Sequence, residues 1–321
     1  MSCASGPTSS SVSSRPAVRP RVAITPGDPR GIGPEIVVQV LAEPPEGAEY
    51  VLIGIDGSEK RKVKSEKGGA FTFHFSLFTG SPRDAGLLVK AQIEHAVALA
   101  LAGEVDAIVT GPAEKAALRA AGMPYPGHTE WLAALAGGVD VAMMLTDERL
   151  RVVLVTTHMP LRAVPDALTR AVIERVGAVT RTALRDWWGL AEPRLAVCAL
   201  NPHAGEAGLF GSEDAMVLGP AARALGAAGP LSADTVFVRA LKGEFDAVLA
   251  PYHDVGMTAI KVAAFGHAVN VTLGLPFVRT APDHGTALDI AGKGIADPGS
   301  MRAAVELAVR LAGRRATARQ A

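Results

Sequence analysis

Short apolar runs, rich in valine, isoleucine and alanine, recur along this chain, and each ends at a glycine, a proline or a polar residue. Runs of this length and composition are typical of buried strands. They predict strands at residues 21–25, 50–55, 105–110, 151–157, 195–200 and 245–250.

Between these runs, apolar residues recur at spacings of three and four, which is the period of one face of a helix. In the segment 84–102 this stripe consists of Val89, Ile93, Ala96, Val97 and Ala100. Residues 165–184 also read as mainly helical, and a further helix is expected to begin near Pro34. Strands that alternate with helices of this length predict right-handed crossovers and a mostly parallel sheet, so the fold class is α/β.

One echo in the sequence bears on the number of sheets. The segment 103–112 (GEVDAIVTGP) resembles the segment 243–252 (GEFDAVLAPY), and four of their first five residues are identical. Both segments fit the same kind of helix-to-strand turn. The echo also favours two α/β units of similar build over one long sheet.

Composition and charge narrow the classes to which this protein can belong. Of its 321 residues 49% are hydrophobic, and 32 Lys and Arg balance 32 Asp and Glu. Such a chain can bury a sizeable core, but it has no overall field that attracts nucleic acid or an anionic membrane. No apolar run reaches the roughly 18–20 residues that span a bilayer. Neither nucleic acid nor membrane is an expected partner, and an anionic substrate needs a local cluster of donors.

The N-terminal residues and the cysteines favour a cytoplasmic location. Residues 1–20 are rich in Ser, Pro and Arg and contain no apolar segment, so we expect a disordered tail and not a secretory signal. Cys3 and Cys198 make neither a disulfide framework nor a metal knuckle. A reducing compartment, by default the cytoplasm, fits this pattern.

Polar residues that follow the strands are the candidates for chemistry, because ligands bind beyond the carboxyl ends of parallel strands. Five of the eight histidines sit in such places: His128, His158, His203, His253 and His284. Taken singly, each fits an ordinary polar loop residue. Three neutral imidazoles with an open fourth position form a recurrent catalytic metal site, and His158, His203 and His253 are the best trio. Their spacing leaves the metal open.

A second set of residues suits an anion. Lys261, Asn270 and Arg279 follow the His253 segment at intervals of nine, and Lys, Arg and amide donors are what a phosphate or carboxylate needs. Solvated surface charge is the alternative for Lys261 and Arg279. Because residues 269–278 (VNVTLGLPFV) are apolar, an Arg at their end is expected to point into a site.

Several familiar motifs are absent from the sequence. The glycines of TPGDPRGIGPE have the wrong order for a dinucleotide fingerprint, and no Walker A motif occurs. Neither a G-x-S-x-G nor a cysteine-centred nucleophile is found. These patterns alone do not indicate NAD.

Many blocks, taken together, match one family. From about residue 21 to about residue 311 the chain resembles the 4-hydroxythreonine-4-phosphate dehydrogenase family of vitamin B6 biosynthesis. The matching blocks, in order, are ITPGDPRGIGPE, TGPAEKAAL, PGHTE, MMLTDE, TTHMPL, LNPHAGE, ADTVF, YHD, NVTLGLPFVRT and DHGTALDIAG.

This resemblance implies a fold and a cofactor. The fold would be two α/β/α domains like those of isocitrate and isopropylmalate dehydrogenases, which bind NAD without the usual glycine fingerprint. Residues 21–130 and 280–321 would form one domain and residues 131–279 the other, with the active site in the cleft between them. The cofactors would be NAD or NADP and a divalent metal such as zinc, magnesium or cobalt.

The resemblance also implies roles for single residues. The metal ligands would be His158, His203 and His253, drawn from two subunits of a homodimer with shared active sites. Asp234 and Asp254 would lie near the metal as candidate catalytic residues. Substrate contacts would be His128, Thr129, Lys261, Asn270 and Arg279.

The reaction implied is oxidation of 4-phosphohydroxy-L-threonine at C3, followed by metal-assisted decarboxylation to 3-amino-2-oxopropyl phosphate, in pyridoxal 5'-phosphate biosynthesis. The base could be a nearby Asp, or His203 through water. The sequence departs from the family at residues 255–257 (VGM), 262–267 and 207–211. Related dehydrogenases of 4-phosphothreonate, 4-phosphoerythronate or a cis-dihydrodiol therefore stay open. A metal-dependent hydrolase and a phosphate acyltransferase are alternatives from other classes.

Overall fold

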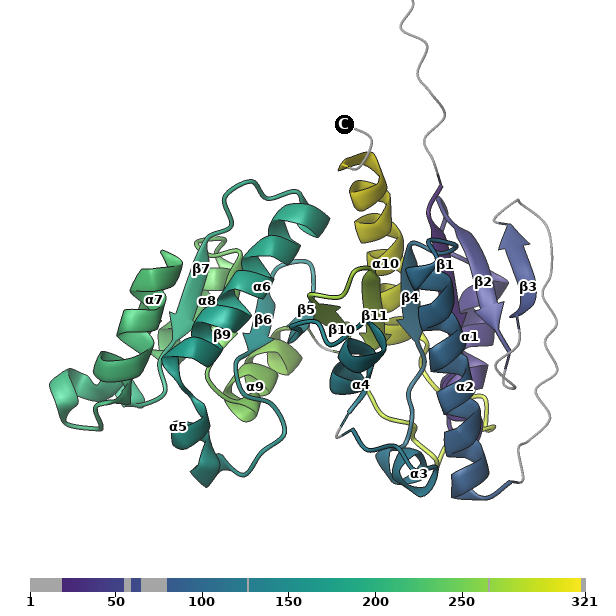
Figure 1. The fold of residues 1–321 in the computed structure, drawn as a ribbon, viewed down its shortest axis with the longest axis horizontal. Helices are drawn as coiled ribbons and strands as arrows, with labels where there is room; N and C mark the ends of the chain where they lie inside the picture. The colour runs from purple at the N-terminus through teal and green to yellow at the C-terminus, as the bar shows by residue number, and fades with distance from the viewer. Residues whose placement is uncertain (1–18, 55–58, 65–79, 126, 265, 319–321) are drawn as a thin grey trace, which may run out of the picture.

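A computed structural model describes residues 19–54, 59–64, 80–125, 127–264 and 266–318 of the chain (Figure 1). The tail predicted at residues 1–20 falls outside these ranges except for its last two residues, and Cys3 and His74 lie outside them as well.

The described strands form a single mixed sheet of eleven strands, in the order β3-β2-β1-β4-β11-β10-β5-β6-β9-β7-β8. Their bounds are β1 (Arg21–Thr25), β2 (Glu49–Ile53), β3 (Glu59–Lys64), β4 (Ala107–Thr110), β5 (Ala142–Thr146), β6 (Arg151–Leu154), β7 (Leu195–Cys198), β8 (Ala228–Leu231), β9 (Ala247–Ala250), β10 (Val269–Leu273) and β11 (Val278–Pro282). The six strands predicted from apolar runs are confirmed, with ends that shift by a few residues.

Most of the strand pairings are parallel, which confirms the α/β prediction. Six of the ten pairings are parallel, and the four antiparallel ones are β2 with β3, β11 with β10, β10 with β5, and β5 with β6. The expectation against one long sheet was wrong, because β10 and β5 hydrogen-bond along their length and join the described strands into one sheet. The division into two α/β units stays a prediction. The domain limits at residues 130 and 280 stay a prediction.

Helices cover both faces of this sheet, and one of them, α10, packs against β11 and β10 near its centre (Figure 1). Their bounds are α1 (Gly33–Ala42), α2 (Pro82–Leu101), α3 (Lys115–Ala120), α4 (His128–Leu135), α5 (Val164–Ala167), α6 (Arg170–Trp188), α7 (Gly219–Leu225), α8 (Ala233–Leu241), α9 (His253–Ala264) and α10 (Gly299–Ala318). Two short 3₁₀ segments, η1 (Leu161–Ala163) and η2 (Pro202–Gly208), and a π-helical segment, η3 (Asp214–Leu218), complete the list. No described helix has the length and apolar character that crossing a bilayer requires.

The helix predicted at residues 165–184 is interrupted near its start. Pro165 belongs to the single turn of α5, and α6 begins only after Thr169, whose hydroxyl accepts a hydrogen bond from the amide of Val172 at 3.3 Å. A side-chain cap of this kind satisfies a free amide at a helix start. The helix ends at Gly189, which takes the left-handed conformation common at that position.

The two faces of the sheet are packed differently. On one face a continuous apolar cluster runs under α1, α10, α6 and α7 from β2 to β7. On the opposite face the core is split into a cluster under α2 and α4 and a separate one under α8 and α9. Strand side chains alternate between faces, so each central strand contributes to both.

Candidate active site

A cavity of about 220 Å³ lies on the face of the sheet whose core is split into two clusters. It is found where β4, β11, β10 and β5 pass between these clusters, and we call this side the second face. It is bordered by the ends of β4 and β11, by the first residues of α3 and α4, and by the loop that follows β6. Of the residues predicted for substrate or metal, it brings together His128, Thr129, His158, Asn270 and Arg279, and it also contains His284.

Arg279 on β11 is a buried cation that lines the cavity, with only 4% of its surface exposed. Its Nη1 donates to the hydroxyl of Thr272 at 3.1 Å and its Nη2 to that of Thr110 at 2.6 Å, while Nε has no partner among the described residues. Burial lowers the pKa of Arg279 to about 10, so the side chain stays charged at neutral pH. A buried cation held only by neutral oxygens favours an anion beside it.

His128, the first residue of α4, adds a neutral group to the same cavity. Burial, followed by the charges of Arg279 and Lys115, lowers the pKa of His128 to about 3. Its Nε2 is buried with no partner among the described residues, and so is Oδ1 of Asn270. Unsatisfied buried polar atoms that face a cavity are ready to bind a polar ligand.

His158 and His253 form a pair at the edge of this cavity. They follow the adjacent parallel strands β6 and β9, and their ring centroids are 5.3 Å apart. Nδ1 of His253 lies 2.8 Å from Oδ1 of Asp254, which leaves Nε2 of His253 free, as is usual for metal-binding histidines. Burial, followed by the charges of Lys115 and His253, lowers the pKa of His158 and keeps its ring neutral. These two side chains therefore fit two ligands of a divalent metal.

His203 and Asp234 are not brought to this pair within the chain. Within the described ranges, no group of three or more His, Cys, Asp or Glu side chains could hold a metal ion. His203 is exposed in η2, where residues 203–207 all take positive φ values, 52° at His203 itself. Asp234 is exposed in the first turn of α8. A third metal ligand would have to come from outside this arrangement.

The left-handed turn of η2 is anchored by a buried carboxylate. Asp214 is 1% exposed and accepts hydrogen bonds from the amides of Leu200 at 2.8 Å and Asn201 at 3.0 Å. The side-chain amide of Asn201 donates a hydrogen bond to the carboxylate of Glu213 at 2.9 Å. Successive positive φ values are costly for residues other than glycine, so these contacts determine where His203 points.

Lys261 lies beside the cavity and does not line it. It is half exposed on α9, and its Nζ is 3.4 Å from a carboxylate oxygen of Asp283, which does line the cavity. The sequence therefore located this lysine near the site but did not show that its charge is shared with a carboxylate.

Five polar residues that were not predicted also line the cavity: Thr110, Lys115, Glu130, Thr157 and Asp283. Thr110 and Lys115 are the first and last residues of TGPAEK, and Glu130 ends the PGHTE block. Each lies near a strand end or a helix start, and this position in the sequence is the feature that could have identified them. That signal does not distinguish them from the many other polar residues in loops.

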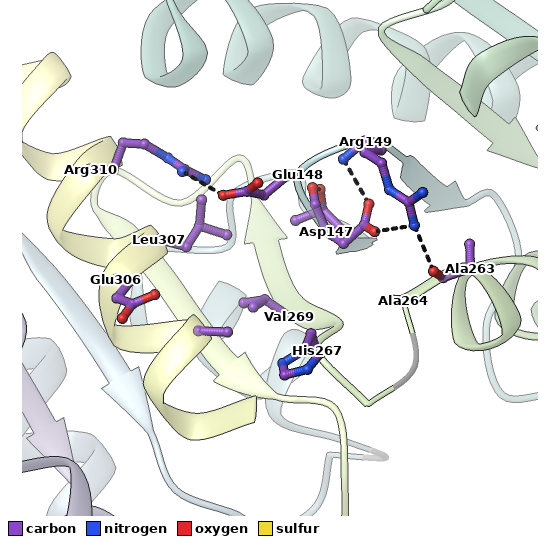
Figure 2. Close-up of a pocket in the computed structure, with 12 residues that line it drawn as sticks. Asp147, Glu148, Arg149, Ala263, Ala264, His267, Val269, Glu306, Leu307 and Arg310 are labelled. Carbon is purple, nitrogen blue, oxygen red and sulfur yellow. Dashed lines mark hydrogen bonds and ion pairs between the residues drawn. The ribbon is translucent and has the colours of Figure 1, made fainter. Parts of the chain in front are cut away.

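A larger cavity of about 510 Å³ lies between α10, the end of α9 and the β5–β6 turn (Figure 2). Its acidic and basic side chains largely satisfy one another. Arg149 contacts Asp147 and the carbonyl of Ala263, and Arg310 approaches Glu148 at 3.9 Å. The smaller cavity, with its unpaired buried cation and neutral imidazoles, is therefore the better candidate for chemistry.

Comparison with known proteins gives the same family as the sequence blocks. The profile of a family described as "Pyridoxal phosphate biosynthetic protein PdxA" matches residues 55–308. A 4-hydroxythreonine-4-phosphate dehydrogenase from Thioalkalivibrio sulfidiphilus (strain HL-EbGR7) is 42% identical, over 91% of this chain and 97% of its own. A crystal structure of 4-hydroxythreonine-4-phosphate dehydrogenase from Klebsiella pneumoniae is 40% identical, covers 91% of this chain and 99% of its own, and superimposes with a TM-score of 0.79.

More distant structures share the fold. A terephthalate 1,2-cis-dihydrodiol dehydrogenase from Burkholderia xenovorans LB400 is 29% identical, with a TM-score of 0.63 over 91% of this chain and 98% of its own. An isocitrate dehydrogenase from Methylococcus capsulatus, 16% identical with a TM-score of 0.50 over 94% of this chain and 88% of its own, is alike in fold alone. The resemblance inferred from the sequence blocks is confirmed: the chain belongs to the PdxA family of pyridoxal phosphate biosynthetic proteins.

Proposed function

We propose that this protein is an NAD- or NADP-dependent dehydrogenase that oxidises 4-phosphohydroxy-L-threonine at C3, after which the product loses CO2 to give 3-amino-2-oxopropyl phosphate. The observation that carries this proposal is the buried Arg279, which has no carboxylate partner among the described residues and lies in one cavity with the neutral imidazoles of His128 and His158. Relatives named 4-hydroxythreonine-4-phosphate dehydrogenase support the choice of substrate.

The charged end of the substrate would bind around Arg279. His128, Thr129 and Asn270 line the same cavity and would supply hydrogen bonds to it. Lys261 would add a charge at the rim, where it is now shared with Asp283. Held there, C3 of the substrate would be positioned for hydride transfer to the nicotinamide.

His158 and His253 would hold a divalent metal ion such as zinc, magnesium or cobalt, and His203 of a second copy of the chain would complete the site in a homodimer. Asp254 would keep the ring of His253 in the tautomer that binds metal. A bound ion of this kind lowers the pKa of a nearby hydroxyl and stabilises negative charge on oxygen.

The chain offers three candidates for the base that takes the hydroxyl proton. They are Asp234, Asp254 and, through a water molecule, His203. Asp254 is already hydrogen-bonded to His253, so a role in orienting that ring competes with a role as base. With the proton removed, hydride leaves C3 for the nicotinamide, and the resulting β-keto acid can lose CO2. We place this enzyme in the cytoplasm.

The test is production of NADH by the purified protein from 4-phosphohydroxy-L-threonine, with NAD and NADP compared. Turnover that stops with a chelator and returns with added metal would support the dehydrogenase and its metal together. Folded, metal-loaded protein that gives neither NADH from NAD nor NADPH from NADP would contradict the proposal. 4-Phosphothreonate, 4-phosphoerythronate and a cis-dihydrodiol would then be tried, and substrate consumed without NADH would indicate a hydrolase.

A further inference from the structure

Lys115 lines the active-site cavity and has no partner within the described ranges. It is the first residue of α3 and is exposed, and no hydrogen bond or ion pair engages its ammonium group. The adjacent carboxylate, Glu114, is taken by Arg30 at 2.5 Å, and Arg30 is held in turn by the fully buried Asp28. Lys115 is therefore a cation in the cavity lining without a counter-charge among the described residues.

The charge of Lys115 acts on two imidazoles of the site, those of His128 and His158. Its charge contributes to the lowered pKa of His128, after burial and Arg279, and to that of His158, directly after burial. The other carboxylates that line the cavity are Glu130, which acts on His158 in the opposite sense, and Asp283, which pairs with Lys261. Neither forms an ion pair with Lys115.

A count of charges shows what the cavity lacks. A phosphate monoester carries a charge of roughly −1.5 to −2 at neutral pH. Arg279 supplies one positive charge, His128 is neutral, and the charge of Lys261 is shared with Asp283. A second full positive charge is needed, and Lys115 is a cation without a partner among the described residues that lines the same cavity as Arg279.

We propose that Lys115 is a further phosphate-binding residue, which together with Arg279 neutralises the dianion of the substrate. Nothing in the resemblance to the family assigned it a role. The inference rests on the proposed function only for the identity of the phosphate ester, because an anion site formed by Lys115 and Arg279 also binds free phosphate.

The experiment measures the dissociation constant of inorganic phosphate by calorimetry on the full chain, without substrate or nicotinamide. Lys115→Met is expected to weaken phosphate binding roughly 10- to 100-fold, the size of a lost charge-assisted contact. Arg119→Met is the matched control, because Arg119 is a basic residue on the same helix that does not line the cavity. It should bind phosphate within about twofold of the unmodified protein.

Two further readouts separate a charge contact from a structural role. Between about pH 5 and 8, where phosphate loses its second proton, the unmodified protein should bind more tightly as pH rises, and Lys115→Met should lose most of this gain. Lys115→Arg should restore most of it. Phosphate binding that is equal in Lys115→Met and the unmodified protein would overturn the inference, as would an unmodified protein that binds no phosphate.

The outcome is distinct from that of the proposed function. Phosphate binding that depends on Lys115, in a protein that makes no NADH, would leave the inference standing and the dehydrogenase assignment wrong. If the protein does make NADH, Lys115→Met should raise the KM for the phosphorylated substrate with a much smaller change in kcat.

Discussion

The two faces of the central sheet use the same strands for opposite purposes. On β10, Val269, Val271 and Leu273 pack into the continuous core, while Asn270 between them lines the cavity. On β11, Val278 joins the core and Arg279 next to it is the buried cation of the site. Because alternate residues point to opposite faces, one strand can serve stability on one side and chemistry on the other.

The difference shows which face of the sheet is less favourable for stability because it carries the site. The core face is apolar from end to end, whereas the other face interrupts its core with groups that are hydrogen-bonded only in part. Removing a side chain should therefore lower stability on the first face and ligand binding on the second.

The largest expected effect tests the second face at its centre. Arg279→Met should lower kcat/KM for the phosphorylated substrate by roughly 100- to 1000-fold, because the buried positive charge proposed to bind the phosphate is lost. Its free energy of unfolding without ligand should not fall, since a buried cation without a counter-ion has been removed. Steady-state kinetics and urea denaturation check the two parts. A variant that keeps its activity but unfolds more readily would show that Arg279 serves stability and not ligand binding.

A polar residue that does stabilise should be one whose hydrogen bonds are complete, and Asp214 is the case to test. Asp214→Ala should cost about 2–3 kcal/mol in the free energy of unfolding, because the amides of Leu200 and Asn201 lose their acceptor. Asp214→Asn, which keeps one carbonyl oxygen, should cost less. Denaturant titration measures both. Equal stability of Asp214→Ala and the unmodified protein would show that the turn carrying His203 does not need this anchor.

Adjacent residues on β10 give the most direct comparison of the two faces. Val271→Ala should cost about 2 kcal/mol in stability and leave KM nearly unchanged, because it opens a small cavity in the continuous core. Asn270→Ala should leave stability within about 0.5 kcal/mol and raise KM. Thermal denaturation and steady-state kinetics of the two variants check this. A loss of stability in Asn270→Ala, or a raised KM in Val271→Ala, would contradict the division between the two faces.

The smallest effect concerns pH. The pKa of His128 is about 3 in the folded protein, below the usual value near 6.5 in an unfolded chain, so as pH falls the unfolded state binds a proton first. Stability should therefore drop by about 1–2 kcal/mol between pH 7 and pH 5. His128→Gln should reduce this slope without abolishing it, because the pKa of His158 is lowered as well. Denaturation curves at three pH values would detect an unchanged slope, which would contradict the burial of this ring.

The regular part of the fold could be predicted from the sequence, because each buried strand is a short apolar run with a turn residue at its end. The run at residues 269–278 is an instructive exception. It contains β10, the turn that follows it and only the first residue of the antiparallel strand β11, and the turn begins at Gly274, where φ is 89°. An uninterrupted apolar stretch hides such a reversal unless the turn residues are weighed more heavily than hydrophobicity.

The candidate site could be predicted only where neighbouring strands deliver the residues. His158 and His253 follow adjacent strands and lie together as the sheet order requires. His203 follows β7, which also pairs with β9, yet the left-handed turn held by Asp214 leads the chain elsewhere. Because non-glycine residues rarely adopt positive φ, the sequence Asn-Pro-His-Ala-Gly does not predict a left-handed turn.

The unpaired charge of Arg279 has a consequence for the life of the protein in the cell. A ligand that binds only the folded state lengthens the time a protein spends folded, by an amount that grows with ligand concentration. Since the cation is costly in an empty cavity and favourable beside an anion, the empty protein should be the form that proteases remove first. The abundance of this enzyme would then follow the supply of the molecule on which it acts.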